Sequence, residues 1–247
     1  MKDYFSGHAK NYATFRPTYP DELYAFILKH VANKQNAWDC GTGNGQVARR
    51  LAEDFEHVDA TDISEKQIEQ APQVENVRYH VCPAEKTPFP DNRFDLITVA
   101  QALHWFDLEK FYAEVKRVAM NGALIAVWGY GLNMVNPDID DLMIDFYSNT
   151  TGPYWDPARR LVETRYEGLL FPFERISFPG FDIKVEWTLH DYIGYLRTWS
   201  ATQAYIRANN VDPTVELFEK MKSFWEPDKP KTVTFPVFGK MGRVMPA

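Results

Sequence analysis

Between residues 19 and 131 the sequence alternates amphipathic segments typical of helices with short apolar segments typical of strands. The strand-like segments are 36–40, 57–63, 77–82, 94–103 and 123–131. The helix-like segments are 19–31, 46–55, 64–72 and a stretch that begins after Asp107 and ends at Asn121–Gly122. Strands that alternate with helices indicate βαβ units. We therefore expect an α/β protein with a doubly wound, mostly parallel sheet and helices on both faces.

The alternation stops after residue 131. Residues 133–170 are typical of helices and loops, and residues 191–206 have the spacing of one further helix. Two β-rich segments could pair antiparallel at one edge of the sheet. We expect a single domain over residues 1–247. Its expected parts are a core at 20–131, a mostly helical cap at 132–225 with one sheet strand near 181–189, and an antiparallel edge strand at 231–244.

The overall composition narrows the possible partners. The chain has 247 residues, of which 45% are hydrophobic and 25% charged, and this suits one sizeable core. Its formal net charge of -7 argues against nucleic acid and anionic membranes, because both need a concentrated basic surface. No apolar run approaches the ~20 residues of a membrane span, and no signal peptide is visible. We expect a cytoplasmic protein, and the sequence leaves its oligomeric state open.

The two cysteines, Cys40 and Cys82, lie in separate apolar segments. Their spacing gives neither a disulfide framework nor a zinc site, so we expect two buried thiols. The sequence contains no other cluster typical of metal ligands. We therefore expect no metal in the site.

A glycine-rich turn, "DCGTGNG", follows the first predicted strand. Gly41 and Gly43 permit a tight turn and a close approach of the backbone to a ligand. Asp62 ends the second strand, 21 residues after Gly41, which is the placement of an acid that binds ribose. In an open α/β sheet, ligands bind beyond the carboxyl ends of the strands. The pattern predicts a nucleoside-binding site there.

Two residues count against a dinucleotide as that ligand. Gln46 occupies the third fingerprint position, where a dinucleotide-binding turn wants glycine or alanine. Asp39 would repel a pyrophosphate but attract a sulfonium group. These features favour S-adenosylmethionine, a positively charged nucleoside without phosphate.

Residues 36–131 resemble the class I S-adenosylmethionine-dependent methyltransferases, through "DCGTGNG", the acid after the second strand and "PAEKTPFPDNRFDLITV". The resemblance implies that the core at 20–131 binds this cofactor. It places Asp39, Gly41, Thr42 and Gly43 near the methionine part, Asp62 on the ribose, Ile63 against the adenine, and Ala84 and Glu85 at the adenine edge. Many relatives carry an acid where this chain has Pro83, so Glu85 or a backbone carbonyl must replace it.

A narrower resemblance extends over most of the chain. The segments that carry it are "RPTYP", "QALHWFDLEKF", "IAVWGYG", "DDLMID", "GPYWDPARR" and "DYIGYLRTWSATQAY". They look like the branch that includes the fungal trans-aconitate 3-methyltransferase and related small-molecule methyltransferases. This resemblance implies a shared architecture, but it does not specify the methyl acceptor, because caps diverge among relatives.

Methyl transfer to a carboxylate needs no general base, because an acid with a reference pKa of ~4 is already ionised at neutral pH. A positive clamp would suffice, and Arg159 and Arg160 in "YWDPARR" are the candidates. His104, just past the fourth strand, could bind the acceptor, or act as the base if the acceptor is a hydroxyl.

Several aromatic and polar residues are further candidates. Trp105, Trp128, Tyr130, Tyr154 and Trp155 could line the acceptor site, and Gln101 could face the cofactor. Residues ahead of the first helix could fold over the cofactor, with aromatic faces against the sulfonium and an arginine on the methionine carboxylate. These residues are Tyr4, Phe5, Tyr12 and Arg16.

Three functions remain open from the sequence. We favour a small-molecule methyltransferase that O-methylates a carboxylate. The alternatives are an NAD-dependent oxidoreductase on a similar sheet and a noncatalytic module that binds the cofactor. Binding of S-adenosylmethionine or NAD separates the first two, and detectable methyl transfer excludes the third.

Overall fold

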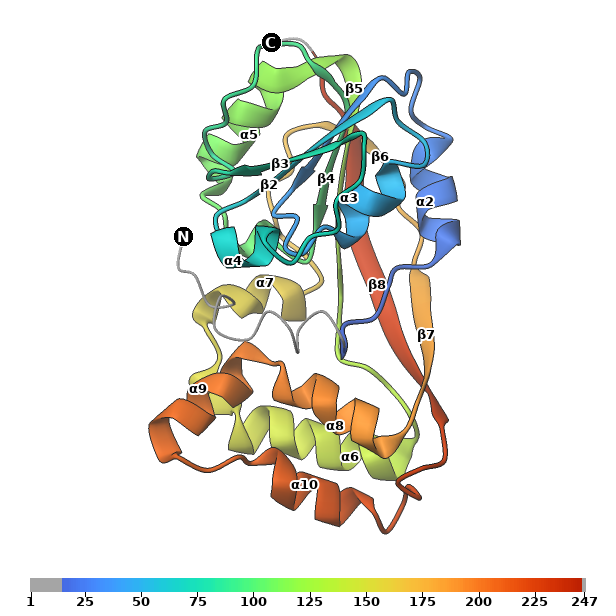
Figure 1. Cartoon of the computed structure of the whole chain (residues 1–247), viewed down its shortest axis with the longest axis vertical. Coiled ribbons are helices and arrows are strands. Elements are labelled where there is room, and N and C mark those ends of the chain that lie inside the picture. Colours follow the sequence, from blue (N-terminus) through green and yellow to red (C-terminus); the bar gives the residue numbers. More distant parts are fainter. Residues whose placement is uncertain (1–14, 246–247) are drawn as a thin grey trace.

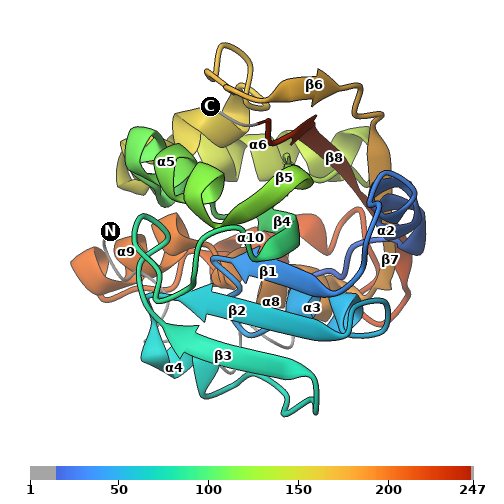
Figure 2. The same ribbon diagram turned by 90° about the horizontal axis from the view of Figure 1, so that it is seen from above.

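The computed structural model describes residues 15–245, which form a sheet with helices on both faces and a helical layer at one end (Figures 1 and 2). The strand order is β3-β2-β1-β4-β5-β8-β6, and β7 also pairs with β8. The strands are β1 (Asn36–Cys40), β2 (His57–Asp62), β3 (Val77–Val81), β4 (Phe94–Ala100), β5 (Ala119–Tyr130), β6 (Glu174–Ile176), β7 (Phe181–Trp187) and β8 (Lys231–Arg243). The first five strands pair in parallel, and β8 pairs antiparallel with β5, β6 and β7, which confirms the predicted fold class.

One prediction about the sheet was wrong: the 231–244 segment is not an edge strand. One side of β8 pairs with β5, from Val237 to Arg243. Its other partners are β6 near Met241–Arg243 and β7 along Lys231–Val237. At 13 residues, β8 is long enough to serve both the core sheet and a ribbon with β7 beyond it. The edge is therefore formed by β6 and β7.

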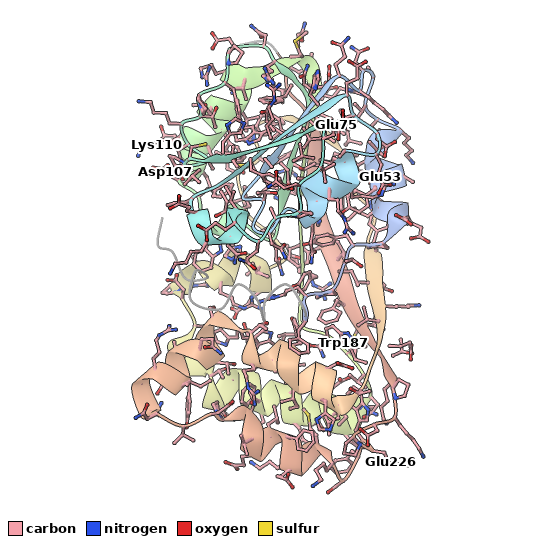
Figure 3. The ribbon with its side chains drawn as sticks, in the orientation of Figure 1. Glu53, Glu75, Asp107, Lys110, Trp187 and Glu226 are labelled. Carbon is pink, nitrogen blue, oxygen red and sulfur yellow. The ribbon has the colours of Figure 1, made fainter. Side chains whose placement is uncertain are left out.

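The helices are α2 (Asp21–Leu28), α3 (Gln46–Leu51), α4 (Glu65–Ile68), α5 (Leu108–Val118), α6 (Pro137–Asp145), α7 (Arg160–Glu163), α8 (Leu189–Arg197), α9 (Ser200–Asn209) and α10 (Thr214–Met221). Ser64 and Asp107 cap the N-termini of α4 and α5, since their side chains accept from the backbone N–H groups of Gln67 and Lys110. Figure 3 shows Asp107 and Lys110 on the outside of the molecule at the start of α5.

Two predicted helix boundaries differ from the structure. The fourth predicted helix ends at Val118, and Asn121–Gly122 lies inside β5, where Gly122 has a φ of +77°. The predicted helix at 191–206 is two helices, because Trp199 is extended between α8 and α9. A change of strand direction or a single extended residue is set by tertiary packing, which helical spacing does not report.

The two faces of the sheet carry alternate residues of each strand, as expected from the period of two. On β5, Leu124 and Ala126 pack in the apolar cluster that includes α2 and α3, whereas Ile125 and Val127 pack in the cluster that includes α5. Both faces of the sheet are thus buried. Polar side chains of the strands can therefore reach a ligand only at the strand ends.

The helices α6, α8, α9 and α10, which we call the cap, lie beyond the carboxyl ends of the parallel strands (Figure 1). The ribbon of β7 and β8 runs from the sheet to the cap. Trp187 lies where β7 meets the cap (Figure 3). Its ring packs on Tyr195 of α8 and Phe235 of β8, with centroid distances of 5.4 and 5.6 Å. The cap is therefore attached to the sheet by strand pairing and aromatic contacts.

Candidate active site

A cavity lies at the carboxyl ends of β1, β2 and β4, where the sequence predicts the nucleoside site. We call it the cofactor cavity. Of the predicted cofactor residues, it is lined by Arg16, Asp39, Gly41, Thr42, Gly43, Asp62, Ile63, Ala84 and Gln101. These residues come from five segments that are distant in the sequence, and four of these segments lie at or after the ends of neighbouring parallel strands.

The glycine-rich turn forms one wall of this cavity. Gly41 has a φ of +68°, and a Cβ there would lie 2.5 Å from the Cβ of Ala102. Gly43 has a φ of +56°, and no atom lies within 4 Å of where its Cβ would be. The first glycine is therefore required for packing. At the second, the backbone conformation favours glycine and leaves open space for a ligand.

Asp62 is held by the backbone of two loops. Its Oδ2 accepts from the Gly43 N–H at 2.9 Å, and its Oδ1 accepts from the Ser64 N–H at 2.8 Å. These two bonds fix the orientation of the Asp62 carboxylate at the mouth of the glycine-rich turn.

Asp39 is almost fully buried, with 1% of its surface exposed. Burial raises its pKa to about 6, although hydroxyl donors oppose that shift. Those donors are Thr42 Oγ1 at 2.5 Å and Thr98 Oγ1 at 2.9 Å. Above this pKa, Asp39 places a negative charge in a dry part of the cavity, where it would attract a cation strongly.

A second cavity adjoins the first, and we call it the acceptor cavity. It shares Arg16, Gln101, Trp105 and Tyr130 with the cofactor cavity. Its other lining residues come from the end of β4, the 155–159 segment and the cap: His104, Trp155, Asp156, Arg159, Tyr195, Trp199 and Ser200. The shared wall marks the place where a group could pass from one ligand to the other.

Gln101 forms part of that shared wall in an unusual conformation. Its φ is +55°, in the left-handed region that costs a residue with a Cβ about 1 kcal/mol or more. Its side-chain amide donates to the Tyr130 carbonyl at 3.2 Å and accepts from the Tyr130 N–H at 3.3 Å. The Tyr130 hydroxyl accepts from Arg16 Nη1 at 2.8 Å. Gln101 therefore fixes the backbone of the residue that contacts Arg16.

His104 lies in the acceptor cavity with 9% of its surface exposed. Burial, and then the Arg159 charge, lower its pKa to about 3. Its Nδ1 is buried and has no hydrogen-bond partner among the described residues. The ring lies 4.5 Å from the Trp105 ring, measured between centroids. At neutral pH His104 is therefore an uncharged imidazole with hydrogen-bonding capacity to spare.

Arg159 is the cation of the acceptor cavity whose charge lowers the pKa of this imidazole. Its guanidinium carbon lies 4.4 Å from the Trp155 ring centroid and 5.6 Å from that of Tyr147. Its Nε donates to the Tyr147 hydroxyl at 3.2 Å. Stacking on two rings holds the plane of the guanidinium and leaves its Nη groups able to grip a carboxylate.

Comparisons with known proteins agree with this geometry. Residues 38–127 match the methyltransferase domain family. A protein of Dictyostelium discoideum, provisionally named a methyltransferase, is 36% identical over 96% of this chain and 93% of its own length. The chain belongs to the class I S-adenosylmethionine-dependent methyltransferases.

Two further relatives extend the likeness. A solved structure from Anaeromyxobacter dehalogenans, provisionally described as a type II methyltransferase, is 40% identical, with a TM-score of 0.86. The match covers 94% of this chain and all of that one. A methyltransferase of Aspergillus candidus is 28% identical over 68% of this chain, which spans 61% of that relative. The first of these extends the likeness through the cap as well as the core.

S-adenosylmethionine is the methyl donor of this methyltransferase, and the cofactor cavity suits it. Asp39 supplies a buried negative charge suited to a sulfonium, and the Asp62 oxygens suit a ribose. Arg16 is the one basic side chain among the described lining residues, so a pyrophosphate would find little to hold it. This agrees with the sequence-based preference against NAD.

Four predicted site residues lie outside both cavities. Arg160 is exposed at the start of α7. The Glu85 carboxylate accepts from the Asp107 N–H at 2.8 Å, before α5, and does not reach the cofactor cavity. The Tyr154 hydroxyl accepts from Asn209 on α9 at 2.8 Å. We correct these three assignments because neighbouring polar groups or the helix surface hold each side chain away from the cavities.

Trp128 is the fourth corrected assignment. It is fully buried on the face of β5 that α2 covers, with ring centroids 5.6 Å from Tyr19 and 6.5 Å from Tyr24. Tyr130, two residues further along the same face, reaches both cavities because the strand ends there. Tyr4, Phe5 and Tyr12 lie outside the described residues, so their predicted roles remain predictions.

Sequence reasoning missed several lining residues. In the acceptor cavity these are Asp156, Tyr195, Trp199 and Ser200, and in the cofactor cavity they include Tyr19, Gln67, Cys82 and Phe106. The one available signal was Trp199, an aromatic residue at the break between two helices. The rest face the cavities only because of how the cap and the loops pack.

The described residues contain no group of three or more His, Cys, Asp and Glu side chains that could hold a metal ion. Within the same part of the chain, no helix is both long enough and apolar enough to cross a membrane.

Proposed function

We propose that this methyltransferase transfers the methyl group of S-adenosylmethionine to a carboxylate oxygen of a small molecule, giving a methyl ester. The observation that carries the proposal is the pairing of Arg159 with a neutral His104 in the acceptor cavity. A guanidinium suits an anionic acceptor, and a carboxylate acceptor has no proton to lose.

Residues of the cofactor cavity would hold the methyl donor. Asp62 would accept from the ribose hydroxyls, and Ile63 and Ala84 would pack on the adenine. Asp39 would stabilise the positive charge on the sulfonium. Arg16, which lines both cavities, would bind the methionine carboxylate. The cofactor supplies a methyl group bonded to a positively charged sulfur, which leaves as a neutral thioether.

The acceptor would lie between Arg159 and the wall that the two cavities share. Among the described lining residues, Arg16 and Arg159 place two guanidinium groups around this space against the single carboxylate of Asp156. Trp105, Trp155 and Trp199 surround the rest and exclude water. An acceptor oxygen at the shared wall would form its bond to the methyl carbon as the methyl–sulfur bond breaks. Alignment of these atoms is the main catalytic requirement.

The chemistry of His104 disfavours a hydroxyl acceptor. A general base works best when its pKa lies near the operating pH, whereas the pKa of His104 is about 3. Such a weakly basic imidazole is suited to donating or accepting a hydrogen bond. We therefore assign it to binding, and we keep the resemblance to the trans-aconitate 3-methyltransferase branch as part of the proposal.

A panel of acceptors tests the proposal. The protein would be incubated with S-adenosylmethionine and, separately, trans-aconitate, fumarate, cinnamate, phenol and glycerol, with products identified by mass. We expect methylated products from carboxylates only, and we expect hydroxylamine to cleave them, because it cleaves esters and leaves ethers intact. Methylation of phenol or glycerol without any ester would overturn the carboxylate assignment. Binding of S-adenosylmethionine with no transfer to any acceptor class would favour a noncatalytic module.

A further inference from the structure

Arg159 is held by a hydrogen-bonded chain that continues beyond the acceptor cavity. Its Nε donates to the Tyr147 hydroxyl at 3.2 Å, and that hydroxyl donates to the Glu163 carboxylate. Among the described residues, Arg159 forms no ion pair of its own. Glu163 therefore orients the phenol that accepts from Arg159 Nε, and the Nη groups stay available.

Tyr147 is itself firmly placed. It belongs to a π-helical turn, Phe146–Thr150, that follows α6, and such turns occur frequently at functional sites. Its carbonyl accepts from Trp155 Nε1 and from the Thr151 hydroxyl, both at 3.2 Å. Its ring stacks on Trp155 at 4.9 Å and meets the edge of Trp199 at 5.7 Å. The hydroxyl that Arg159 needs is thus presented by a rigid aromatic cluster.

The other end of the chain is placed by α7. Glu163 is the last residue of that helix, which begins at Arg160. Tyr166, three residues later, is fully buried, and its backbone N–H donates to the Leu161 carbonyl at 2.8 Å. Its φ of +59° is left-handed, which a non-glycine residue adopts only where its surroundings require it. The segment from Arg159 to Glu163 is therefore anchored onto the sheet.

We infer that Tyr147 and Glu163 are positioning residues that set the guanidinium of Arg159 for the methyl acceptor. The inference rests on the proposed function, since it assumes that Arg159 grips an anionic acceptor. A free arginine side chain has high rotamer entropy, and an acceptor would have to overcome its loss on binding. Contacts with the Trp155 and Tyr147 rings, with one bond at Nε, remove much of this cost in advance.

The same chain makes acceptor binding sensitive to groups that do not touch the acceptor. Glu163 is exposed and lines neither cavity, as is also true of Glu167 in the same segment. Tyr154 has a hydroxyl in the cap that bonds Asn209 and not Arg159. Glu167 and Tyr154 offer matched controls, because Glu167→Gln and Tyr154→Phe make the same chemical changes as Glu163→Gln and Tyr147→Phe.

The test combines binding with a signal from Arg159 itself. Affinities for trans-aconitate and cinnamate would be measured by calorimetry with S-adenosylhomocysteine present, and the Nε–H resonance of Arg159 would be followed by NMR. We expect Tyr147→Phe to lower the affinity for the better-bound acid roughly three- to tenfold, and Glu163→Gln to lower it roughly two- to fivefold. Solvent exchange of the Arg159 Nε–H should accelerate in both, while S-adenosylmethionine affinity and both controls stay at wild-type values.

Each outcome has a distinct meaning. An Arg159 Nε–H signal that exchanges equally slowly in Tyr147→Phe would overturn the inference. Faster exchange with unchanged affinity for the acids would also overturn it, and would leave the proposed function standing if Arg159→Gln alone weakens binding. If Arg159→Gln leaves the affinity for both acids unchanged, the clamp is overturned, and the inference with it.

Discussion

The cofactor cavity takes its polar groups from loops at the ends of neighbouring strands, whereas the acceptor cavity takes many of its groups from the cap and from the segment before α7. In the cofactor cavity, carboxylates such as Asp62 are already bonded to backbone N–H groups close by. In the acceptor cavity, Arg159 is held by aromatic rings and a phenol from another element. The difference indicates that the sheet builds most of the cofactor cavity, while the lining of the acceptor cavity depends on how the cap packs.

Substitution of Arg159 should give the largest difference between the effect on the acceptor and the effect on the cofactor. We expect Arg159→Gln to lower kcat/KM for a carboxylate acceptor roughly 100-fold, because a charged bidentate partner is lost. S-adenosylmethionine affinity should stay the same, since Arg159 does not line the cofactor cavity. Steady-state kinetics and calorimetry would measure both. The neighbouring exposed residue gives the control, and an equal loss in Arg160→Gln would contradict the placement of the clamp.

Asp62 should give the reverse pattern. We expect Asp62→Ala to weaken S-adenosylmethionine binding by roughly 1.5–3 kcal/mol, the scale of hydrogen bonds to a charged group. At saturating cofactor, the KM of the acceptor should change little. Isothermal titration would test this, and an affinity equal to that of wild type would remove Asp62 from the ribose role.

Asp39 should affect both cofactor affinity and stability. Burial raises its pKa from 3.8 to about 6, so ionising it destabilises the folded state as the pH rises through this range. A shift of this size corresponds to a cost on the order of 3 kcal/mol above pH 6, and to none below the unfolded value. We expect Asp39→Asn to unfold at a higher temperature than wild type at pH 8, and to lose that advantage at pH 4.

The same variant should bind S-adenosylmethionine about tenfold more weakly at pH 8, because the charge that attracts the sulfonium is absent. Wild-type affinity should rise between pH 5 and 7 as Asp39 ionises, and the variant should lack this rise. S-adenosylhomocysteine, which has no positive sulfur, should show a smaller difference between the proteins. Equal losses for the two ligands would contradict the electrostatic role.

His104 should give the smallest effect. Because its pKa is about 3, the imidazole stays neutral from pH 5 upward. His104 should therefore cause no rise in the rate of ester formation near pH 6.5. We expect His104→Gln to retain activity within about fivefold, since glutamine can replace a neutral hydrogen-bonding group. A limb near pH 6.5 that disappears in this variant would instead indicate a hydroxyl acceptor and a catalytic base.

The sequence allowed much of the core to be predicted for a physical reason. A parallel strand, its glycine turn and the next strand's terminal acid are neighbours in both sequence and space, so the spacing of Gly41 and Asp62 carries the geometry. Glu85 was misplaced because the sequence could not show that its carboxylate bonds the chain ahead of α5.

The cap was harder to predict because its contacts join distant segments. Arg159 and Arg160 look equivalent in sequence, yet successive residues near a helix start point about 100° apart, so one faces the cavity and the other solvent. Tyr147 carried no signal at all, since its role depends on a π-helical turn meeting another segment. Trp128 shows the opposite error: we predicted this aromatic residue in a cavity wall, whereas it packs in the core.

The place of β8 in the sheet also constrains how the protein is made. This strand is translated after β5, β6 and β7, yet it lies between β5 and the other two. Until the ribosome has passed Arg243, β5 lacks one of its two neighbours, and β6 and β7 lack the strand with which they pair. Adding β8 requires pairings across long stretches of chain, which are slow to form. Newly synthesised chains would thus expose unpaired strand edges and be prone to aggregate until β8 pairs. A chaperone that shields such edges would help most at this stage.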